Sequence, residues 1–243
     1  IRGELNGSAR IRGDIRNPAM AGLLTLNRAG LAIPYLNVNY DFAPAATIRL
    51  DDKTFDFRSI RLTDVAMGTS ATLDGTIRHQ FFDDWNLNLN VDTQGERLLL
   101  LNTEFDEDEL YYGTAYAVGT GRIYGPVNAL NIDFVGSTGR GTSLKIPISD
   151  VASVGDYSFI NFIEKDLQRL EAQERSLKEY EGLELQFDLD VTPEAEVEIV
   201  VDRQTGSSLK VRWAGLIFME INTNGKFNMW GDFVATEGSY RLK

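Results

Sequence analysis

The feature that most constrains the fold of this chain is a strict alternation of apolar and polar residues. In residues 183–191 every odd position is apolar and every even position is polar. A period of two places successive side chains on opposite faces of a β-strand. The same phase recurs in 85–91, 197–201 and 209–221, with Gly, Asn, Asp or Pro between the runs. The sequence therefore predicts an all-β chain whose strands have one apolar and one wet face.

The segments between these runs are short, and this limits how the strands can pair. Parallel neighbours need a crossover connection of a dozen or more residues, usually a helix, so antiparallel pairing is predicted. Asn224–Gly225 has the composition of a two-residue hairpin turn. An apolar sheet face must be hidden by sandwiching, by closing into a barrel or by curling around a ligand.

The residue types on the apolar face favour curling. They are mostly aliphatic residues and glycines, with few Phe or Trp, whereas a sandwich needs bulky residues that interdigitate. We therefore expect an elongated, curled antiparallel sheet, that is, an open β-groove with an apolar interior. This groove is expected to span residues 1–243 as one segment of a longer protein, because the chain begins with Ile1 rather than Met.

A second regularity is an apolar-x-Gly-x-apolar pattern, in which the glycine points to the same face as its apolar neighbours. Glycine inside a strand marks a bend, a bulge or a close approach of two backbones. Strand curvature alone is one interpretation, and a gap in the packing of the apolar face is the other. The pattern occurs at residues 1–5, 11–15, 73–77, 123–127, 213–217 and 229–233.

Residues 156–181 depart from the alternation. Four apolar residues in this charged segment follow helical spacing, and Gly182 has the composition of a helix stop. The spacing predicts a helical insertion near residues 160–180 that lies across the sheet or covers an open edge. An extended acidic loop is the alternative interpretation. The four residues are Ile163, Leu167, Leu170 and Leu177.

Composition removes several classes of function. The formal net charge of −12 argues against sequence-independent nucleic-acid binding, which depends on clustered Lys and Arg. With no cysteine and one histidine, the chain has no disulfide, thiolate nucleophile or Cys/His zinc site. No run approaches the roughly 18 apolar residues of a membrane-spanning helix. His79 lies between a strand-like run and a turn, and we expect a satisfied surface histidine rather than a member of a catalytic triad.

Three other motifs suggest chemistry at first sight. The acidic run 104–109 could hold a weak calcium ion but lacks EF-hand spacing, so a solvated turn is predicted. Asp188 and Asp190 share the wet face of their strand and should point to solvent. Residues 136–141 are rich in glycine, but a strand-like run follows where a phosphate loop needs a helix N-terminus. A flexible hairpin loop is predicted there, and we expect no catalytic residues, no metal and no cofactor.

The C-terminal part of the chain carries motifs that resemble a known family. Residues 189–197, Leu-Asp-Val-Thr-Pro-Glu-Ala-Glu-Val, look like a stretch of the TamB translocation and assembly proteins. The resemblance covers most of residues 110–242 and is greatest to Bacteroidetes-type members. Its further motifs are residues 141–148, 159–163, 202–206, 220–232 and 237–240.

The resemblance implies a periplasmic β-groove protein, similar to AsmA-like bridge-type lipid transfer proteins. It implies an inner-membrane anchor in the full-length protein, an Omp85-family partner (TamA-like or related) in the outer membrane, and no catalytic residues. The leading hypothesis is a conduit that carries phospholipid acyl chains between the two membranes. The first alternative is a structural or chaperone-like module that receives strands of outer-membrane proteins by β-augmentation. The second is an extracellular carbohydrate-binding sandwich.

The conduit hypothesis assigns its lining to residues that share one phase of neighbouring strands. Their partners on the opposite phase, Glu184, Gln186, Glu196 and Glu198, should face water, and Glu198→Lys should be nearly silent. The residues expected to line one continuous apolar floor are Leu185, Phe187, Leu189, Val197, Ile199, Val201, Leu209, Val211, Met219 and Ile221.

Overall fold

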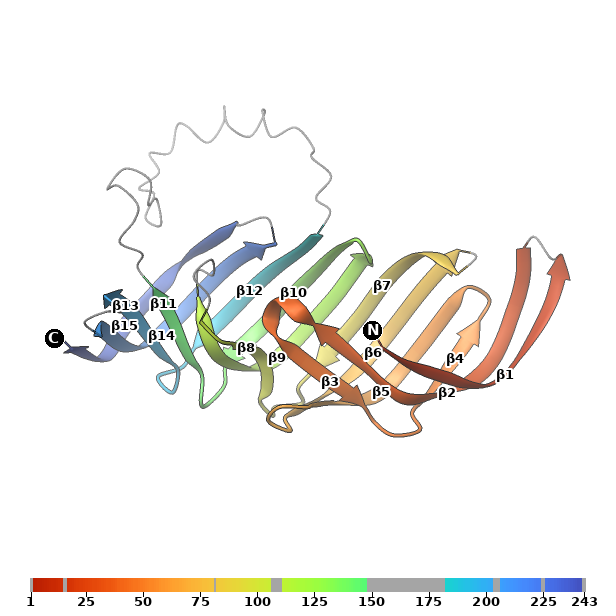
Figure 1. Cartoon of the computed structure of the whole chain (residues 1–243), viewed down its shortest axis with the longest axis horizontal. Helices are drawn as coiled ribbons and strands as arrows, with labels where there is room; N and C mark the ends of the chain where they lie inside the picture. Colours follow the sequence, from red (N-terminus) through yellow and green to blue (C-terminus); the bar gives the residue numbers. More distant parts are fainter. Residues whose placement is uncertain are drawn as a thin grey trace, which may run out of the picture.

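The computed structural model describes residues 2–14, 17–80, 82–105, 111–147, 182–202, 206–223 and 226–241. In this part of the chain all fifteen strands belong to one sheet. The strands lie side by side along the long axis of the molecule, with β1 near one end and β15 at the other (Figure 1). The prediction of an elongated, curled all-β sheet is confirmed.

The order of elements follows the chain with few exceptions. From β1 to β10 most neighbours in sequence are also neighbours in the sheet, and β15 pairs only with β14 among the described strands. The strands are β1 (Arg2–Asp14), β2 (Asn17–Ile33), β3 (Val38–Phe42), β4 (Thr47–Asp51), β5 (Thr54–Asp64), β6 (Ser70–Gln80), β7 (Asp83–Asp92), β8 (Leu98–Thr103), β9 (Tyr112–Pro126), β10 (Ala129–Thr138), β11 (Ser143–Pro147), β12 (Gly182–Val191), β13 (Glu196–Asp202), β14 (Ser207–Asn222) and β15 (Phe227–Arg241), with one 3₁₀ turn, η1 (Pro34–Leu36), between β2 and β3.

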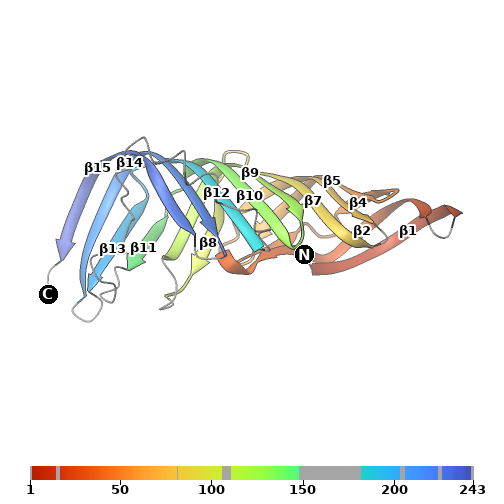
Figure 2. The same cartoon turned by 90° about the horizontal axis from the view of Figure 1, so that it is seen from above.

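Three pairs of consecutive strands are each the two halves of one interrupted strand. β3 and β4 both pair with β2, β10 and β11 both pair with β9, and β12 and β13 both pair with β14. Two of these interruptions are tied together, because the Thr192 N–H donates to Thr138 Oγ1 over 2.9 Å. Interruptions and bulges let a sheet bend while its ladders continue. They account for the curl seen along the molecule (Figure 2).

Residues 136–138 are the end of β10, and residues 139–141 lie in the break between β10 and β11, so the prediction of a hairpin loop was wrong. β10 and β11 run in the same direction along β9, and Thr142 holds the break in place. Its hydroxyl accepts the Tyr116 N–H over 3.0 Å and donates to the Gly139 carbonyl over 2.8 Å. The Arg97 guanidinium also lies over the Tyr116 ring at 4.6 Å.

Two ladders are parallel, which the sequence did not predict. β10 pairs with β12 and β11 pairs with β13 in parallel register, while the other ladders are antiparallel. The chain connects β11 to β12 through residues 148–181, which is long enough for the return that parallel pairing needs. The predicted helical insertion near 160–180 falls in that segment and lies outside the described residues, as do the turn at 224–225 and most of the acidic run 104–109.

The predicted division into a wet and an apolar face is clear in the central strands. In β7, Leu87, Leu89 and Val91 are buried, while the asparagines between them are exposed. The expectation of few inward aromatic residues was wrong. Phe42 and Phe57, for example, are both buried and meet edge to face with their centroids 6.4 Å apart. A curled sheet encloses more space than aliphatic side chains fill, and large rings occupy it.

At Gly75, the glycine pattern marks a close approach of two neighbouring strands. Gly75 has a φ of +128°, and a Cβ added there would collide with the carbonyl oxygen of Asn88 on β7. A side chain at this position would therefore push the two strands apart. This geometry favours the curvature interpretation over a functional gap.

The three glutamates among the predicted wet-face residues form ion pairs, whereas Gln186 is exposed. Glu198 is only 14% exposed, and its carboxylate lies 3.7 Å from Lys210 Nζ and 3.8 Å from Lys145 Nζ. Burial alone would raise the pKa of this carboxyl, but a hydrogen bond from Ser208 and the two ammonium groups outweigh it. The pKa of Glu198 therefore lies below its ordinary value of 4.5.

These contacts reverse the expectation that Glu198→Lys is nearly silent. The substitution would place a third ammonium beside Lys145 and Lys210, and we expect it to lower the free energy of unfolding by about 2 kcal/mol. Because the folded-state pKa of Glu198 is depressed, the stabilisation is present above pH 4.5 and is lost as the pH falls through the folded-state pKa. Urea denaturation of wild type, Glu198→Lys and Glu198→Gln at neutral and acidic pH measures both effects. A Glu198→Lys protein as stable as wild type at neutral pH would contradict the assignment.

Candidate binding groove

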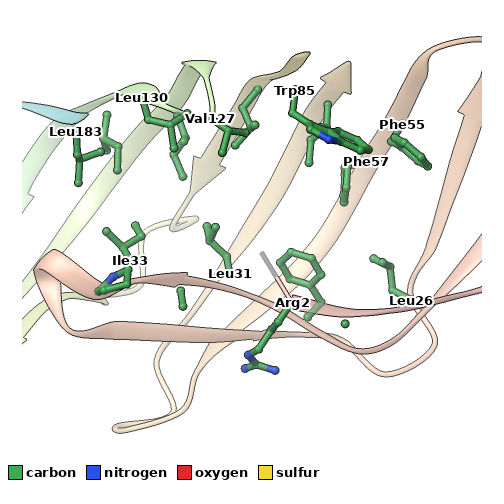
Figure 3. Close-up of a pocket in the computed structure, with 18 of the residues that line it drawn as sticks. Arg2, Leu26, Leu31, Ile33, Phe55, Phe57, Trp85, Val127, Leu130 and Leu183 are labelled. Carbon is green, nitrogen blue, oxygen red and sulfur yellow. The ribbon is translucent and has the colours of Figure 1, made fainter. Parts of the chain in front are cut away.

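The interior of the curled sheet contains a large apolar cavity between β2 and the opposite wall. Leu26, Leu31 and Ile33 project from β2, and Trp85, Val127, Leu130 and Leu183 face them across the space (Figure 3). The cavity has a volume of about 630 Å³. This lies within the roughly 300–1,000 Å³ of sites that bind organic ligands. We refer to it as the first cavity.

Local sequence explains why these side chains converge. The inward positions of β7 are Trp85, Leu87, Leu89 and Val91, which are the apolar members of the alternating run 85–91. The first two line the cavity. Among the described residues that line the cavity, Arg2 and Asn128 have polar side chains. The Arg2 guanidinium donates to Asn39 Oδ1 over 3.0 Å and pairs with Asp41. The arrangement suits an apolar ligand with a polar end.

A smaller apolar space lies toward the C-terminal end of the sheet. This second cavity has a volume of about 120 Å³ and is lined by residues of η1 and of β8 to β15. Five of the residues predicted to line a groove face it. These are Phe187, Leu189, Val197, Met219 and Ile221.

The two cavities share no lining residue, and packed side chains separate them. Along β12, Leu183 lines the first cavity and Phe187 lines the second, while Leu185 between them is 0% exposed and lines neither. The same change occurs within η1, where Pro34 lines the first cavity and Leu36 the second. We call the packed side chains around Leu185 the partition.

Hydrogen bonds hold the elements that meet near the partition. η1 and β3 both contact β8. The Tyr40 hydroxyl donates to the Leu99 carbonyl over 2.5 Å, and Asn37 Nδ2 donates to the Asn102 carbonyl over 2.5 Å. Burial and the charge of Asp64 raise the pKa of Tyr40 far above neutrality, so the phenol keeps its proton.

Five of the predicted lining residues contact neither cavity, namely Leu185 of the partition and Ile199, Val201, Leu209 and Val211. Ile199 pairs with Leu209 and Val197 pairs with Val211 across the β13–β14 ladder, and these side chains are half-buried or buried. Val201 lies beside an irregularity of the same ladder and is also half-buried. Ile199, Val201, Leu209 and Val211 continue the apolar face beside the second cavity, whereas Val197 lines it. Sequence reasoning missed the first cavity, because its lining comes from strands whose pairing the alternation does not reveal.

His79 is buried, so the prediction of a surface histidine was wrong. The residue is only 4% exposed, and its ring stacks on Phe82 with the centroids 4.5 Å apart. Trp85 and Phe55, which line the first cavity, lie at 5.0 and 5.5 Å. Nδ1 accepts the Phe82 N–H over 3.0 Å, and Nε2 has no hydrogen-bond partner among the described residues. Burial, and then the charge of Lys53, lower the pKa of His79 from 6.5.

His79 should therefore make the fold sensitive to mild acid. Below pH 6.5 the unfolded chain takes up a proton that the folded protein resists, so the free energy of unfolding falls as the pH decreases. His79→Phe keeps the aromatic stack and should remove this dependence. Urea denaturation of both proteins at about pH 7.5 and about pH 5.5 measures the difference. An equal decrease in the free energy of unfolding at acidic pH in the two proteins would show that His79 does not titrate as described.

Neither a metal-binding cluster nor a membrane-spanning helix is found among the described residues. They contain no group of three His, Asp or Glu side chains that could hold a metal ion. They also contain no helix long and apolar enough to cross a membrane. Asp188 and Asp190 lie on the outward face of β12, with Asp190 exposed. What the described part of the chain does offer is an apolar interior.

The fold and its interior define a class of protein, an open β-groove with an apolar lining. The family described as TamB C-terminal domain matches residues 59–243, and the chain belongs to this family. The match covers β6 to β15 and most of β5, whereas β2, which forms one wall of the first cavity, precedes it. No curated protein and no solved structure matches the chain significantly.

Membership in this family indicates the general role of the chain. The TamB family is a family of transport and assembly modules that is not known as enzymatic, and membership implies a periplasmic, envelope-associated protein. In general they work with an Omp85-family partner. Membership in this family therefore indicates involvement in outer-membrane protein assembly or lipid transfer.

Proposed function

We propose that this chain carries phospholipid acyl chains in its apolar interior, as a segment of a periplasmic conduit between the inner and outer membranes. The observation that carries the proposal is the first cavity, an apolar space of about 630 Å³ whose two walls belong to one open sheet. A closed globular core would be filled by its own side chains. Here the sheet leaves unfilled apolar volume.

The energetics suit a carrier of acyl chains. Burying a lipid tail is worth about 0.8 kcal/mol for each CH₂ group. Because one stretch of apolar wall resembles the next, a tail can slide along such a wall with little change in free energy. The packed side chains of the partition would resist the sliding of a lipid tail. The second cavity must also widen before it accepts a tail. Passage through this segment therefore requires movement of the packed side chains around Leu185.

The same proposal includes the position of the full-length protein between the two membranes. In the full-length chain an inner-membrane anchor and an Omp85-family partner would place the two ends of the groove at the two membranes. A second function, reception of outer-membrane strands by β-augmentation, is favoured by β15. This strand is long and exposed and pairs only with β14 among the described strands.

Native mass spectrometry of the purified protein tests the proposal. A lipid carrier should retain co-purified phospholipid, and the bound mass should disappear after detergent exchange and return on incubation with phospholipid vesicles. A strand-receiving module needs no lipid. Protein that is folded yet takes up no phospholipid from vesicles would overturn the carrier function and leave β-augmentation as the better account.

A further inference from the structure

An exposed apolar patch lies on the outward face of the sheet at its C-terminal end. Met219 of β14 and its register partner Met229 of β15 line the second cavity, so Phe218 and its partner Trp230 point to the opposite, outward face. These two rings stack with their centroids 6.1 Å apart, yet Trp230 is 50% exposed. By contrast, the outward face of β7 carries asparagines. Clustered apolar side chains on a solvent face indicate an interaction site.

Three more apolar side chains extend this patch to neighbouring strands. Val135 of β10 and Phe218 are both register partners of Asp188 on β12, so one row of outward side chains crosses β10, β12, β14 and β15. Leu216 occupies the next outward position of β14, and Val234 follows on the same face of β15. All members of the patch except Phe218 are at least half exposed. We call this set the outer patch, namely Val135, Leu216, Phe218, Trp230 and Val234.

Three carboxylates lie among the side chains of the outer patch. Asp188 is the register partner of Phe218. Asp190 and Asp232 flank Leu216 from β12 and β15. Among the described residues, none of these three carboxylates has an ion pair or a hydrogen bond, whereas the glutamates that pair with Lys210 and Lys226 on the same face do. The outer patch therefore combines exposed apolar side chains with three uncompensated negative charges.

This combination restricts what can cover the outer patch. A wholly apolar partner would remove the three carboxylates from water without replacing their hydration, which costs free energy. An anionic partner, such as a nucleic acid or an anionic membrane, would be repelled by them. A partner that presents apolar side chains together with Lys or Arg gains from packing and also compensates the charges. The face of the Trp230 ring adds a surface that attracts cations.

We infer that the outer patch is a docking surface for a segment of another protein in which Lys or Arg flank large apolar side chains. The apolar side chains of this segment would pack against Phe218 and Trp230, and its cations would pair with Asp188, Asp190 and Asp232. Trp is among the residue types that most often dominate the affinity of an interface. This role is separate from the proposed carrier function, which uses the inward face, and from β-augmentation, which uses the backbone edge of β15.

A synthetic peptide in which leucine and lysine alternate serves as the probe, because it presents apolar and cationic side chains together. Its fluorescein-labelled form is titrated with the purified chain at about 0.15 M salt, and fluorescence anisotropy gives the Kd. We expect Trp230→Ala to raise the Kd at least about tenfold. Asp188→Asn combined with Asp190→Asn should raise it about tenfold and weaken its salt dependence. The matched control, Asp83→Asn combined with Asp84→Asn, makes the same charge change on the distant strand β7 and should raise the Kd less than about twofold.

Three results would overturn this docking surface. If Trp230→Ala and the double aspartate variant bind the peptide as wild type does, the peptide is held by net charge or by the edge of β15. If wild type self-associates in analytical ultracentrifugation and Trp230→Ala does not, the outer patch binds a second copy of this chain. If flotation with phosphatidylglycerol vesicles depends on Trp230, the patch binds a membrane. Trp230→Ala should retain the wild-type amount of phospholipid, because Trp230 lines neither cavity, so each of these results leaves the carrier function standing.

Discussion

Leu185→Ala should lower the free energy of unfolding by about 3 kcal/mol, one of the largest stability effects expected in this chain. Leu185 is fully buried and lies between Ile132 of β10 and Ile221 of β14 in the cross-strand register. Truncation removes apolar contacts and leaves a cavity that the rigid ladders on both sides prevent from collapsing. Chemical denaturation measures the loss directly.

The matched control is Leu216→Ala on the neighbouring strand β14. Leu216 points outward and is 50% exposed, so the same truncation should change the free energy of unfolding by less than about 0.5 kcal/mol. Leu185→Ala should also join the two cavities, because Leu185 is part of the partition. A loss below about 1 kcal/mol for Leu185→Ala would contradict the packed partition.

Ile33→Asp should abolish lipid retention while the sheet persists. Ile33 is half-buried at the end of β2 and faces the first cavity opposite Leu183 (Figure 3). An ionised carboxylate there is costly beside an acyl chain but can be hydrated once the lipid is absent. We expect the amount of bound phospholipid to fall by at least about tenfold, which corresponds to about 1.4 kcal/mol. Native mass spectrometry quantifies the lipid, and circular dichroism checks the strands.

Ile33→Leu serves as the control for this variant, because it keeps the volume and polarity of the side chain. It should retain lipid at the wild-type level. Folded Ile33→Asp protein with undiminished lipid would show that the first cavity is not where acyl chains reside. Loss of lipid in both variants would show that lipid retention depends on the shape of the side chain at position 33 rather than on its charge.

The one-sided character of the fold could be predicted from single strands. In runs such as 85–91 and 183–191 the period of two alone determines which side chains point inward, and the structure places them as expected. His79 shows the limit of the method, because its neighbours in sequence suggested a surface turn. Its burial depends on Phe55 and Trp85, which come from other strands.

Pairing between distant strands was the part that sequence could not supply. The alternation is the same for parallel and antiparallel ladders, so the β10–β12 and β11–β13 pairs carried no signal except the length of segment 148–181. For the same reason, Val201 and Ile199 were grouped with Leu189, although only Leu189 lines a cavity. Phase along one strand says which face a residue occupies, but the enclosed space depends on the opposite wall.

Photo-crosslinking at two adjacent positions of β7 shows directly whether acyl chains occupy the interior of the sheet. Trp85 lines the first cavity, and Asn86 points outward into solvent. Benzoylphenylalanine is placed at each position in turn, the protein is loaded from phospholipid vesicles and irradiated, and adducts are identified by mass. The account predicts phospholipid adducts at position 85 and none above background at position 86. Equal labelling at both positions, or none at either, would contradict an interior that holds acyl chains.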